Sequence, residues 1–208
     1  MPAPATWRGR PVAPVALRDP RVHLVPLDPS HAADLHAAGQ DPEIWRHLLD
    51  GGAPFPDVAA AAAWIAAARQ AWDDAVRLPF AVVDPATGRA VGSTSYYFEP
   101  RWPSRTLEVG STWLAPSHRG TAVNPVAKAL LLGHAFDDLG AERIELLTDA
   151  RNTRSQRAIE RLGARREGVL RRNAICADGF VRDTVTYAVL AEDWPAVREG
   201  LAARAASR

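Results

Sequence analysis

The sequence predicts a single α/β domain built on a mixed sheet, and three observations support this prediction. Apolar segments of strand length are joined by short turns at 84–88 and 177–179, which is typical of hairpins. One β-α-β unit is indicated by a strand pattern at 106–114, a helical pattern after it and a second strand pattern at 143–148. Hydrophobic residues make up 47% and charged residues 24% of the chain, which are globular proportions.

Caps and turns set the bounds of the expected elements. Asp57 is a favoured residue at a helix N-cap, and Gly140 and Gly163 are typical just beyond a helix C-terminus. The expected strands are 22–27, 79–83, 90–98, 106–114, 143–148, 168–176 and 181–190. The expected helices are about 30–38, 57–75, 125–139, 153–162 and 193–203.

The length of 208 residues fits one domain with a short extension. Residues 1–20 hold five prolines and show no strand or helix period, so we expect a flexible Pro/Ala-rich arm before one domain over 21–208. The start lacks the pattern of a secretory signal, and no apolar run has the length of a membrane-spanning helix. A single cysteine excludes a disulfide framework. These features predict a cytoplasmic protein that does not bind membranes.

The charges provide no global field that would attract nucleic acid, because 25 Lys and Arg residues balance 24 Asp and Glu residues. Of the 25 cations, Lys128 is the single lysine. Eight arginines but only two glutamates lie in 151–172, and this excess makes nucleic-acid binding one alternative function. The six histidines show no paired spacing of metal ligands, so we expect no metal.

The most informative segment is the strand at 106–114. Gly110 inside it indicates a bulge or a close approach of the backbone to a ligand. Strict alternation predicts one face with Leu107, Val109 and Trp113 and another with Glu108, Gly110 and Thr112.

The helix after this strand has a clear start. Asn124 is a favoured N-cap, and Pro125 fits the next position because its missing N–H is not needed there. The free N–H groups of such a helix end attract anions, and Gly120 lets the backbone approach one. The segment lacks the endings of a nucleotide P-loop and of a dinucleotide fingerprint. We therefore expect a main-chain phosphate cradle formed by Arg119, Gly120, Thr121, Ala122, Val123 and Asn124.

A second strand–helix unit follows at 143–163. Asn152 lies where the strand ends and the helix begins, which is the usual place of a ligand crevice in such sheets. Ser155 begins the buried stripe of the helix. Arg154 and Arg157 lie on another face, where either solvent or a phosphate can meet them.

Three motifs resemble the GNAT superfamily of N-acetyltransferases: Trp-Leu-Ala-Pro at 113–116, Arg-Gly-Thr-Ala-Val-Asn at 119–124, and Asn-x-x-Ser at 152–155 with Glu-Arg-Leu-Gly-Ala at 160–164. The hairpin with Gly-Val-Leu-Arg-Arg at 168–172 and Arg-Asp-Thr-Val at 182–185 is similar to the RimJ/RimL-like branch. That branch includes acetyltransferases of ribosomal-protein N-termini. The resemblance implies a mostly antiparallel central sheet of about seven strands flanked by helices, with a splay between strands four and five.

The resemblance also implies an activity. An acetyl group moves from acetyl-CoA to a primary amine by direct attack, and the acceptor is either a protein N-terminus or a small molecule. The cradle binds the pyrophosphate of acetyl-CoA, and the Asn152 side chain holds the pantetheine arm, unless it only caps the helix. Main-chain N–H groups near Trp113 and Leu114 polarise the thioester carbonyl. The protein is a monomer or a homodimer.

Two side chains are candidates for proton transfer. Amines arrive mostly protonated at neutral pH, so a base is needed, and Glu108 is the candidate near the expected splay. An exposed strand Glu paired with Arg is the competing interpretation. Ser155 is the candidate acid that protonates the thiolate, and a first-turn hydroxyl that satisfies an N–H is its alternative.

The chain departs from the family pattern at several positions. Ala122 stands where the family commonly has glycine, and Asn124 stands where it commonly has glycine or alanine. Ile159 stands where many members carry a tyrosine acid. A non-catalytic acyl-CoA-binding regulatory module is therefore the alternative function. Five aromatic residues form either an acceptor pocket or core: Trp45, Tyr96, Tyr97, Phe98 and Trp102.

Overall fold

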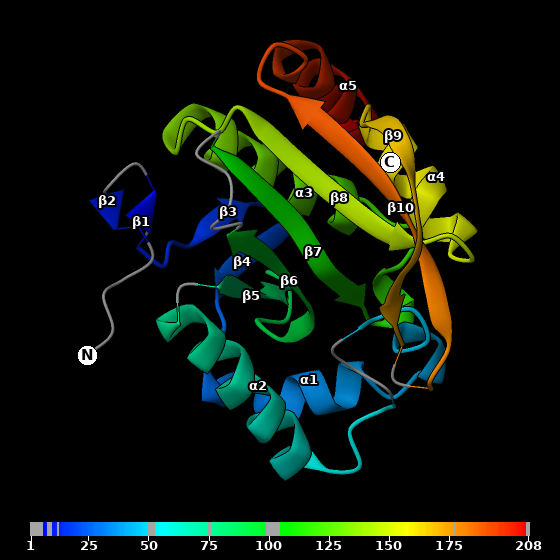
Figure 1. Ribbon diagram of the computed structural model, residues 1–208. Helices are drawn as coiled ribbons and strands as arrows, with labels where there is room; N and C mark the ends of the chain where they lie inside the picture. Colours follow the sequence, from blue (N-terminus) through cyan, green and yellow to red (C-terminus); the bar gives the residue numbers. More distant parts are fainter. Residues whose placement is uncertain are drawn as a thin grey trace.

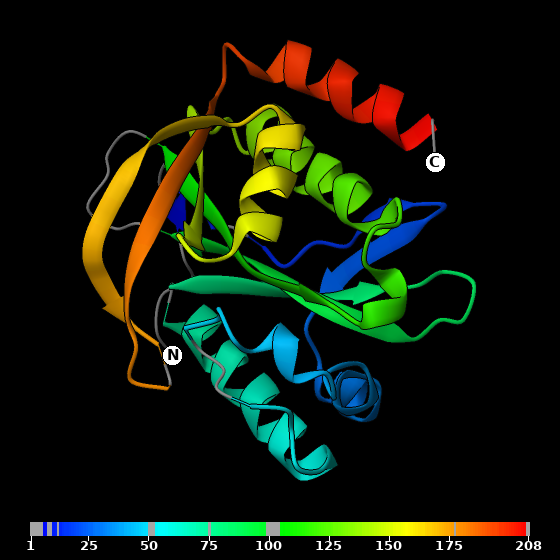
Figure 2. The same ribbon diagram turned by 90° about the vertical axis from the view of Figure 1, so that its right-hand side faces the viewer.

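The computed structural model describes residues 6–7, 10–11, 13–49, 53–74, 76–98, 105–176 and 178–206. Its centre is an eight-stranded sheet that carries helices on both faces (Figures 1 and 2). In spatial order the strands are β3 (Leu17–Asp19), β4 (Val22–Pro26), β5 (Arg77–Val83), β6 (Ala90–Phe98), β7 (Thr106–Leu114), β8 (Arg143–Asp149), β10 (Val181–Leu190) and β9 (Arg165–Ile175). A separate pair consists of β1 (Thr6–Trp7) and β2 (Arg10–Pro11).

In the described part of the chain, five α-helices cover the two faces of the sheet. One face carries α1 (Ala32–Ala38) and α2 (Val58–Asp73), and the other carries α3 (Val123–Gly133), α4 (Thr153–Leu162) and α5 (Trp194–Ala206) (Figure 2). A π-helical turn, His134–Asp138, extends α3. Short 3₁₀ turns occur at Pro29–His31, Pro42–Ile44 and Pro116–His118.

Each face of the sheet buries its own hydrophobic cluster. The larger cluster includes Leu131 of α3, Ile159 of α4 and Leu201 of α5. The smaller cluster joins Leu35 of α1 and Ile65 of α2 to the opposite side of the same strands. Burying one such side chain contributes about 1.5–3 kcal/mol, so both faces hold the strands in place.

The strand pairing opens the sheet near its middle. Neighbouring strands are antiparallel except β7 and β8, which are parallel and pair only from Thr106–Arg143 to Glu108–Glu145. Beyond Glu108 the two strands diverge (Figure 1). They are the fifth and sixth strands of this sheet, and without the added edge strand β3 they are its fourth and fifth. The expected splay is therefore confirmed.

The sequence predicted the fold class and the β-α-β unit, and both are confirmed. The sheet has eight strands rather than about seven, because Leu17–Asp19 pairs with β4 although it belongs to the stretch expected to be an arm. Residues 1–5, 8–9 and 12 of that stretch lie outside the described residues. In the described part of the chain, no helix combines the length and the apolar character needed to cross a membrane.

Candidate active site

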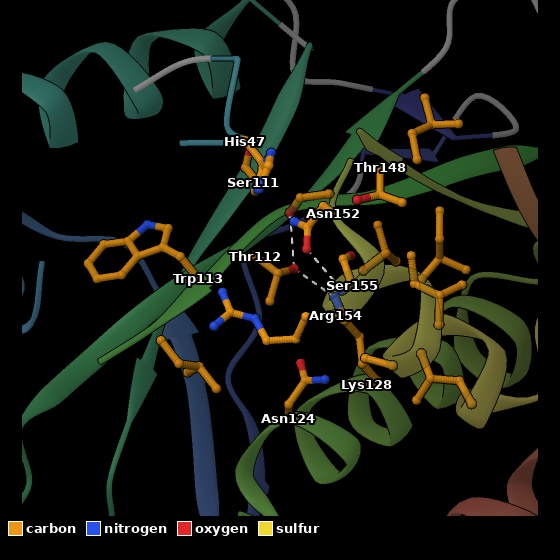
Figure 3. A pocket seen from close by; sticks show the side chains of 18 of the residues that line it. His47, Ser111, Thr112, Trp113, Asn124, Lys128, Thr148, Asn152, Arg154 and Ser155 are labelled. Atoms are coloured by element: carbon orange, nitrogen blue, oxygen red, sulfur yellow. Dashed lines mark hydrogen bonds between the residues drawn. The ribbon is translucent and has the colours of Figure 1, made fainter. Parts of the chain in front are cut away.

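The divergence of β7 and β8 leaves a cavity of about 710 Å³. β7, β8, α3, α4 and the segment 43–49 all contribute to its lining. Cavities that bind small ligands measure roughly 300–1,000 Å³, so this one can hold an extended molecule. Figure 3 shows side chains from β7, α3 and α4 that converge on the same space.

The cradle residues lie at one end of this cavity. Arg119, Gly120, Thr121 and Asn124 line it directly. The predicted N-cap is wrong, because α3 begins at Val123 and its N-cap is Ala122, which makes no side-chain cap. Thr121 replaces the missing cap: its hydroxyl oxygen accepts from the Val123 N–H at 3.2 Å.

The shifted start of α3 leaves the anion site intact. Asn124 and Pro125 lie in the first turn, where N–H groups have no intrahelical acceptors and a proline is tolerated. Gly120 has φ of +73°, a left-handed conformation that glycine adopts without steric cost. The helix end therefore still presents main-chain N–H groups to the cavity.

Arg119 is fixed by two hydrogen bonds at the cavity wall. Its Nη1 lies 2.6 Å from Asp41 Oδ2, and its Nε donates to the Leu114 carbonyl at 3.0 Å. Its Nη2 is buried and has no hydrogen-bond partner among the described residues. A buried donor without an acceptor is costly, so this atom fits an anionic oxygen bound in the cradle.

The charged side chains around the cavity are mostly positive. Two glutamates, Glu43 and Glu108, contribute to the lining. Five arginines do so as well: Arg119, Arg154, Arg161, Arg182 and Arg204. Arg154 and Arg157 are the two arginines that the sequence indicated as possible phosphate contacts. Arg154 lines the cavity, and Arg157 does not. This charge balance favours a ligand with several phosphates.

A β-bulge in β7 shapes the cavity wall. Ser93 pairs with Trp113 and Ser95 with Gly110, so β7 carries one more residue than β6 over this interval. Ser111 adopts φ of +45° within the bulge. The sequence predicted an irregularity at Gly110, and the register shift confirms it.

The bulge reverses the alternation that the sequence predicted. Leu107 and Val109 pack in the cluster on the α3 face, but Trp113 packs in the cluster with α1 and α2. Thr112 instead turns toward α3, where its hydroxyl accepts a hydrogen bond from Lys128 Nζ at 2.7 Å. The expected common face for Leu107, Val109 and Trp113 is therefore wrong, because one extra residue shifts the period of the strand.

Glu108 lies where the two strands part. It is the last β7 residue in the ladder to β8, and its side chain lines the cavity. A Cβ placed on Gly110 would come within 2.5 Å of Glu108 Oε1, so the carboxylate lies over the glycine backbone. Gly110 thus leaves the room that the carboxylate occupies.

Asn152 and Ser155 lie at the start of α4, beside the cavity. Asn152 Oδ1 accepts a hydrogen bond from the Ser155 N–H at 3.0 Å. Asn152 therefore caps the helix, which was the alternative to its role in holding a ligand. Both residues also line the cavity. The cap occupies the Asn152 oxygen and leaves its amide NH₂ to donate to a ligand.

Lys128, the single lysine of the chain, is a functional candidate that no sequence motif marks. It is 5% exposed, it lines the cavity, and burial lowers its pKa to about 7 although the charge of Glu108 acts in the opposite direction. The one feature of the sequence that distinguishes Lys128 is its composition: the chain has 24 arginines and a single lysine. The burial of Lys128 results from the packing of α3 against the sheet, and no sequence pattern predicts that packing.

Another feature at the cavity wall that no sequence pattern indicates is the pair of His47 and Asp149. His47 lines the cavity, and its Nδ1 lies 3.4 Å from Oδ2 of the buried Asp149. Burial of Asp149 opposes its ionisation, but hydrogen bonds from Arg151 and His47 outweigh this and lower the pKa of Asp149 to about 2. The two residues are 102 positions apart, so sequence alone could not pair them.

The expected aromatic wall is mostly core. Tyr96 and Trp45 are buried in the two hydrophobic clusters, and Phe98 packs against the larger one. Tyr97 alone of the described aromatic candidates lines the cavity, where its hydroxyl lies 2.5 Å from Ser111 Oγ. Trp102 lies outside the described residues. Ile159, which replaces the family tyrosine, is 7% exposed and lines the cavity without any group that could donate a proton.

Comparison with known proteins agrees with this fold and site. The family described as "Acetyltransferase (GNAT) domain" matches residues 21–165. The structure of a GCN5-related N-acetyltransferase from Brucella melitensis is 28% identical, covers 92% of this chain and 86% of its own, and superposes with a TM-score of 0.84. The structure of Mycobacterium smegmatis RimJ in complex with CoA-disulfide is 25% identical, covers 92% and 93%, and has a TM-score of 0.76.

Curated relatives match over shorter segments. The two matches are each 29% identical over 55% and 44% of this chain, and they span 62% and 49% of the relatives' own lengths. One of them is "Putative ribosomal N-acetyltransferase YdaF" from Bacillus subtilis (strain 168).

The chain therefore belongs to the GNAT acetyltransferase family. Its structural neighbours include Mycobacterium smegmatis RimJ, whose structure contains CoA-disulfide.

Proposed function

We propose that this chain transfers an acetyl group from acetyl-CoA to the primary amine at a protein N-terminus. The observation that carries the proposal is the cavity between β7 and β8, which has a phosphate cradle at one end and a carboxylate, Glu108, at the strand divergence. An extended thioester can enter between the strands while an amine approaches its acetyl end.

The cradle binds the pyrophosphate of acetyl-CoA. Main-chain N–H groups over 119–124 and the positive end of α3 face the anion, and Arg119 Nη2 supplies a further donor. Arg154 and Arg161 from α4 add positive charge at the cavity wall for the remaining phosphate. The Asn152 amide donates to the pantetheine arm.

Glu108 acts as the base for the incoming amine. It accepts a proton from the acceptor ammonium, directly or through water, so that the nitrogen lone pair can attack the thioester carbonyl carbon. The position of Glu108 at the end of the parallel ladder supports this role, because the cavity begins there.

The carbonyl oxygen becomes negative as the amine adds. Main-chain N–H groups near Trp113 and Leu114, beyond the bulge, stabilise this charge. The Ser155 hydroxyl donates a hydrogen bond to the leaving sulfur. A serine is itself a weak acid at neutral pH, so the proton that the thiolate finally takes must come from another group.

Two observations favour a protein N-terminus over a small amine as the acceptor. YdaF is named as a putative ribosomal N-acetyltransferase. The 168–185 hairpin resembles the RimJ/RimL-like branch, which includes acetyltransferases of ribosomal-protein N-termini. The test is thiol release from acetyl-CoA in the presence of peptides that differ in their first residue, compared with small primary amines. Turnover with the free peptide but not with its N-blocked form supports the proposal. Turnover with small amines alone contradicts the acceptor. CoA binding without any thiol release identifies a non-catalytic acyl-CoA-binding module.

A further inference from the structure

Lys128 combines features that packing alone does not require. It lies on α3 with its side chain directed toward the sheet, and only 5% of it is exposed. Its Nζ donates to Thr112 Oγ1 at 2.7 Å, and that oxygen also lies 2.8 Å from Thr94 Oγ1. A lysine is seldom buried unless its ammonium is paired, because the charge loses its hydration. The Thr112 hydroxyl is a neutral partner, so the amine can exist with or without its extra proton.

The amine lies at the reactive part of the cavity. Lys128 and Thr112 line it from α3 and β7, and Asn152 and Ser155 line it from α4. Figure 3 shows these four side chains gathered in one region of the pocket. In the proposed function the pantetheine arm lies between β7 and β8 and meets Asn152, so its sulfur comes close to Lys128 on the wall of the same cavity.

The charged groups around this region allow the amine to lose and regain its proton. Besides Lys128, the titratable side chains that the described residues place on the cavity wall are Glu43 and His47 from the N-terminal segment, Tyr97 from β6 and Glu108 from β7. The Tyr97 hydroxyl lies 2.5 Å from Ser111 Oγ. The arginines there are Arg119 from the cradle, Arg154 and Arg161 from α4, Arg182 from β10 and Arg204 from α5. Glu108 favours the charged form of Lys128, and burial opposes it and lowers the Lys128 pKa to about 7.

The chemistry of the side chain matters at this position. An arginine stays protonated in proteins, whereas a lysine amine can release a proton when it is buried. The chain uses arginine for 24 of its 25 cations, and its one lysine faces the cavity. Ile159, at the place of the family's tyrosine acid, cannot donate a proton.

We propose that the Lys128 ammonium protonates the thiolate of CoA as the acetyl group leaves. This role rests on the proposed acetyl transfer. The amine nitrogen forms a bond to the carbonyl carbon, the carbon–sulfur bond breaks, and the sulfur takes a proton from Nζ. The acceptor nitrogen loses two protons in all. The first leaves its ammonium through Glu108 and passes to solvent, and the second, lost as the nitrogen adds to the carbonyl, passes through water and restores the Lys128 ammonium. The net products are the acetylated amine, CoA thiol and one proton released to solvent. Thr112 is a positioning residue that holds Nζ toward the sulfur.

The first test compares Lys128→Met and Lys128→Arg with the wild type. Methionine fills a similar volume without a titrating group, and arginine keeps the charge but does not release a proton. We expect both variants to bind CoA and to lose about 10²-fold or more in kcat with little change in KM for acetyl-CoA. The wild-type rate should fall at high pH as Lys128 deprotonates, and this fall should be absent in the residual activity of Lys128→Met.

The matched control is Leu130→Met on the same helix, which is partly buried but does not line the cavity. It should keep the wild-type kcat and pH profile, because such a swap conserves volume. If Lys128 only fills space, Lys128→Met behaves like this control. Wild-type kcat in Lys128→Met, with the same fall at high pH, overturns the proposal.

A second measurement does not depend on turnover. Because the chain has one lysine, carbon-13 label at lysine Cε gives a single side-chain NMR signal, which reports the titration of Lys128. We expect CoA to move the midpoint of this titration, and 3′,5′-ADP, which lacks the thiol arm, to leave it unchanged. Equal effects of the two probes overturn the role of Lys128. Calorimetry that shows no binding of CoA overturns the proposed function, and the inference with it.

Discussion

Arg119 connects the phosphate cradle to the N-terminal half of the chain through Asp41, whose Oδ2 lies 2.6 Å from Arg119 Nη1. The bond spans 78 positions of sequence and links the turn before α3 to the turn that precedes His47. Asp41 is itself the N-cap of that second turn, where its side chain accepts from the Glu43 N–H. One carboxylate thus orients both the arginine of the cradle and the segment that closes the cavity.

The Arg119–Asp41 pair should matter for binding of CoA more than for the chemical step. In Asp41→Asn the guanidinium loses its charged partner, so we expect a several-fold weaker affinity for CoA and an unchanged kcat at saturating acetyl-CoA. Calorimetry with CoA and steady-state kinetics measure the two effects. Asp73→Asn removes an equal charge from an exposed site on α2 and should change neither. An Asp41→Asn chain with wild-type affinity would show that the pair does not preorganise the cradle.

The cradle conformation should be sensitive to a Cβ at Gly120. No atom of the described residues lies within 4 Å of the position that a Cβ would take, so the cost of Gly120→Ala comes from its φ of +73°. That conformation costs an L-residue about 1–2 kcal/mol, and we expect this loss in urea unfolding together with weaker CoA binding.

Gly200→Ala in α5 provides the matched control. A Cβ at Gly200 would also meet no atom of the described residues within 4 Å, and the position is helical. It should therefore stabilise the chain by about 0.5–1 kcal/mol and leave CoA binding unchanged. Equal effects of the two substitutions would contradict the backbone explanation for Gly120.

Asp149 should make stability depend on acid. Its pKa is lowered to about 2, so its ionised form stabilises the fold above the usual aspartate range, and this contribution is lost as the pH falls from about 4 to 2. Asp149→Asn leaves the donors of Arg151 and His47 without their charged acceptor, which should cost about 1–3 kcal/mol at pH 7. Urea unfolding at pH 7 and near pH 3 should show a smaller difference between the two proteins at the lower pH. If the difference in unfolding free energy between the wild type and Asp149→Asn is larger near pH 3 than at pH 7, the stabilising role of ionised Asp149 is wrong.

Glu108 should be required for the chemical step. Removing a general base typically lowers the rate by about 10²–10⁴-fold, so we expect Glu108→Gln to lower kcat to that extent and to lose the rate decrease at low pH. Glu145→Gln is a suitable control, because Glu145 pairs with Glu108 across the ladder and does not line the cavity. Full turnover of Glu108→Gln between about pH 6 and 9 would remove Glu108 from the base role. Ser155→Ala, which removes only a hydrogen bond to sulfur, should have a smaller effect.

The sequence predicted most elements because local signals define their ends. Asp57 caps α2 by accepting from the Ala60 N–H at 2.7 Å, and Gly163 ends α4 with φ of +97°. The strand at Thr106–Leu114 and the helix at Thr153–Leu162 have the expected bounds. In each case a side chain or a glycine acts on its own backbone, so the signal is present in the local sequence.

The features that the sequence did not predict depend on contacts between segments that are distant in the chain. The extra residue at Ser111 is defined only against β6, and it moves Trp113 to the other face of the sheet. α3 begins before the position that the sequence predicted, because the Thr121 hydroxyl, rather than the Asn124 side chain, accepts the hydrogen bond from the Val123 N–H at the helix start. Lys128 and the His47–Asp149 pair become candidate functional residues only in the folded chain, where α3, β7 and the N-terminal segment surround one cavity.

The most direct test of the account is a crystal structure of the chain with bound CoA. We expect the pyrophosphate within hydrogen-bond distance of main-chain N–H groups in 119–124, at the end of α3, and the pantetheine arm between β7 and β8. A pyrophosphate bound at any other place on the molecule would contradict the central claim.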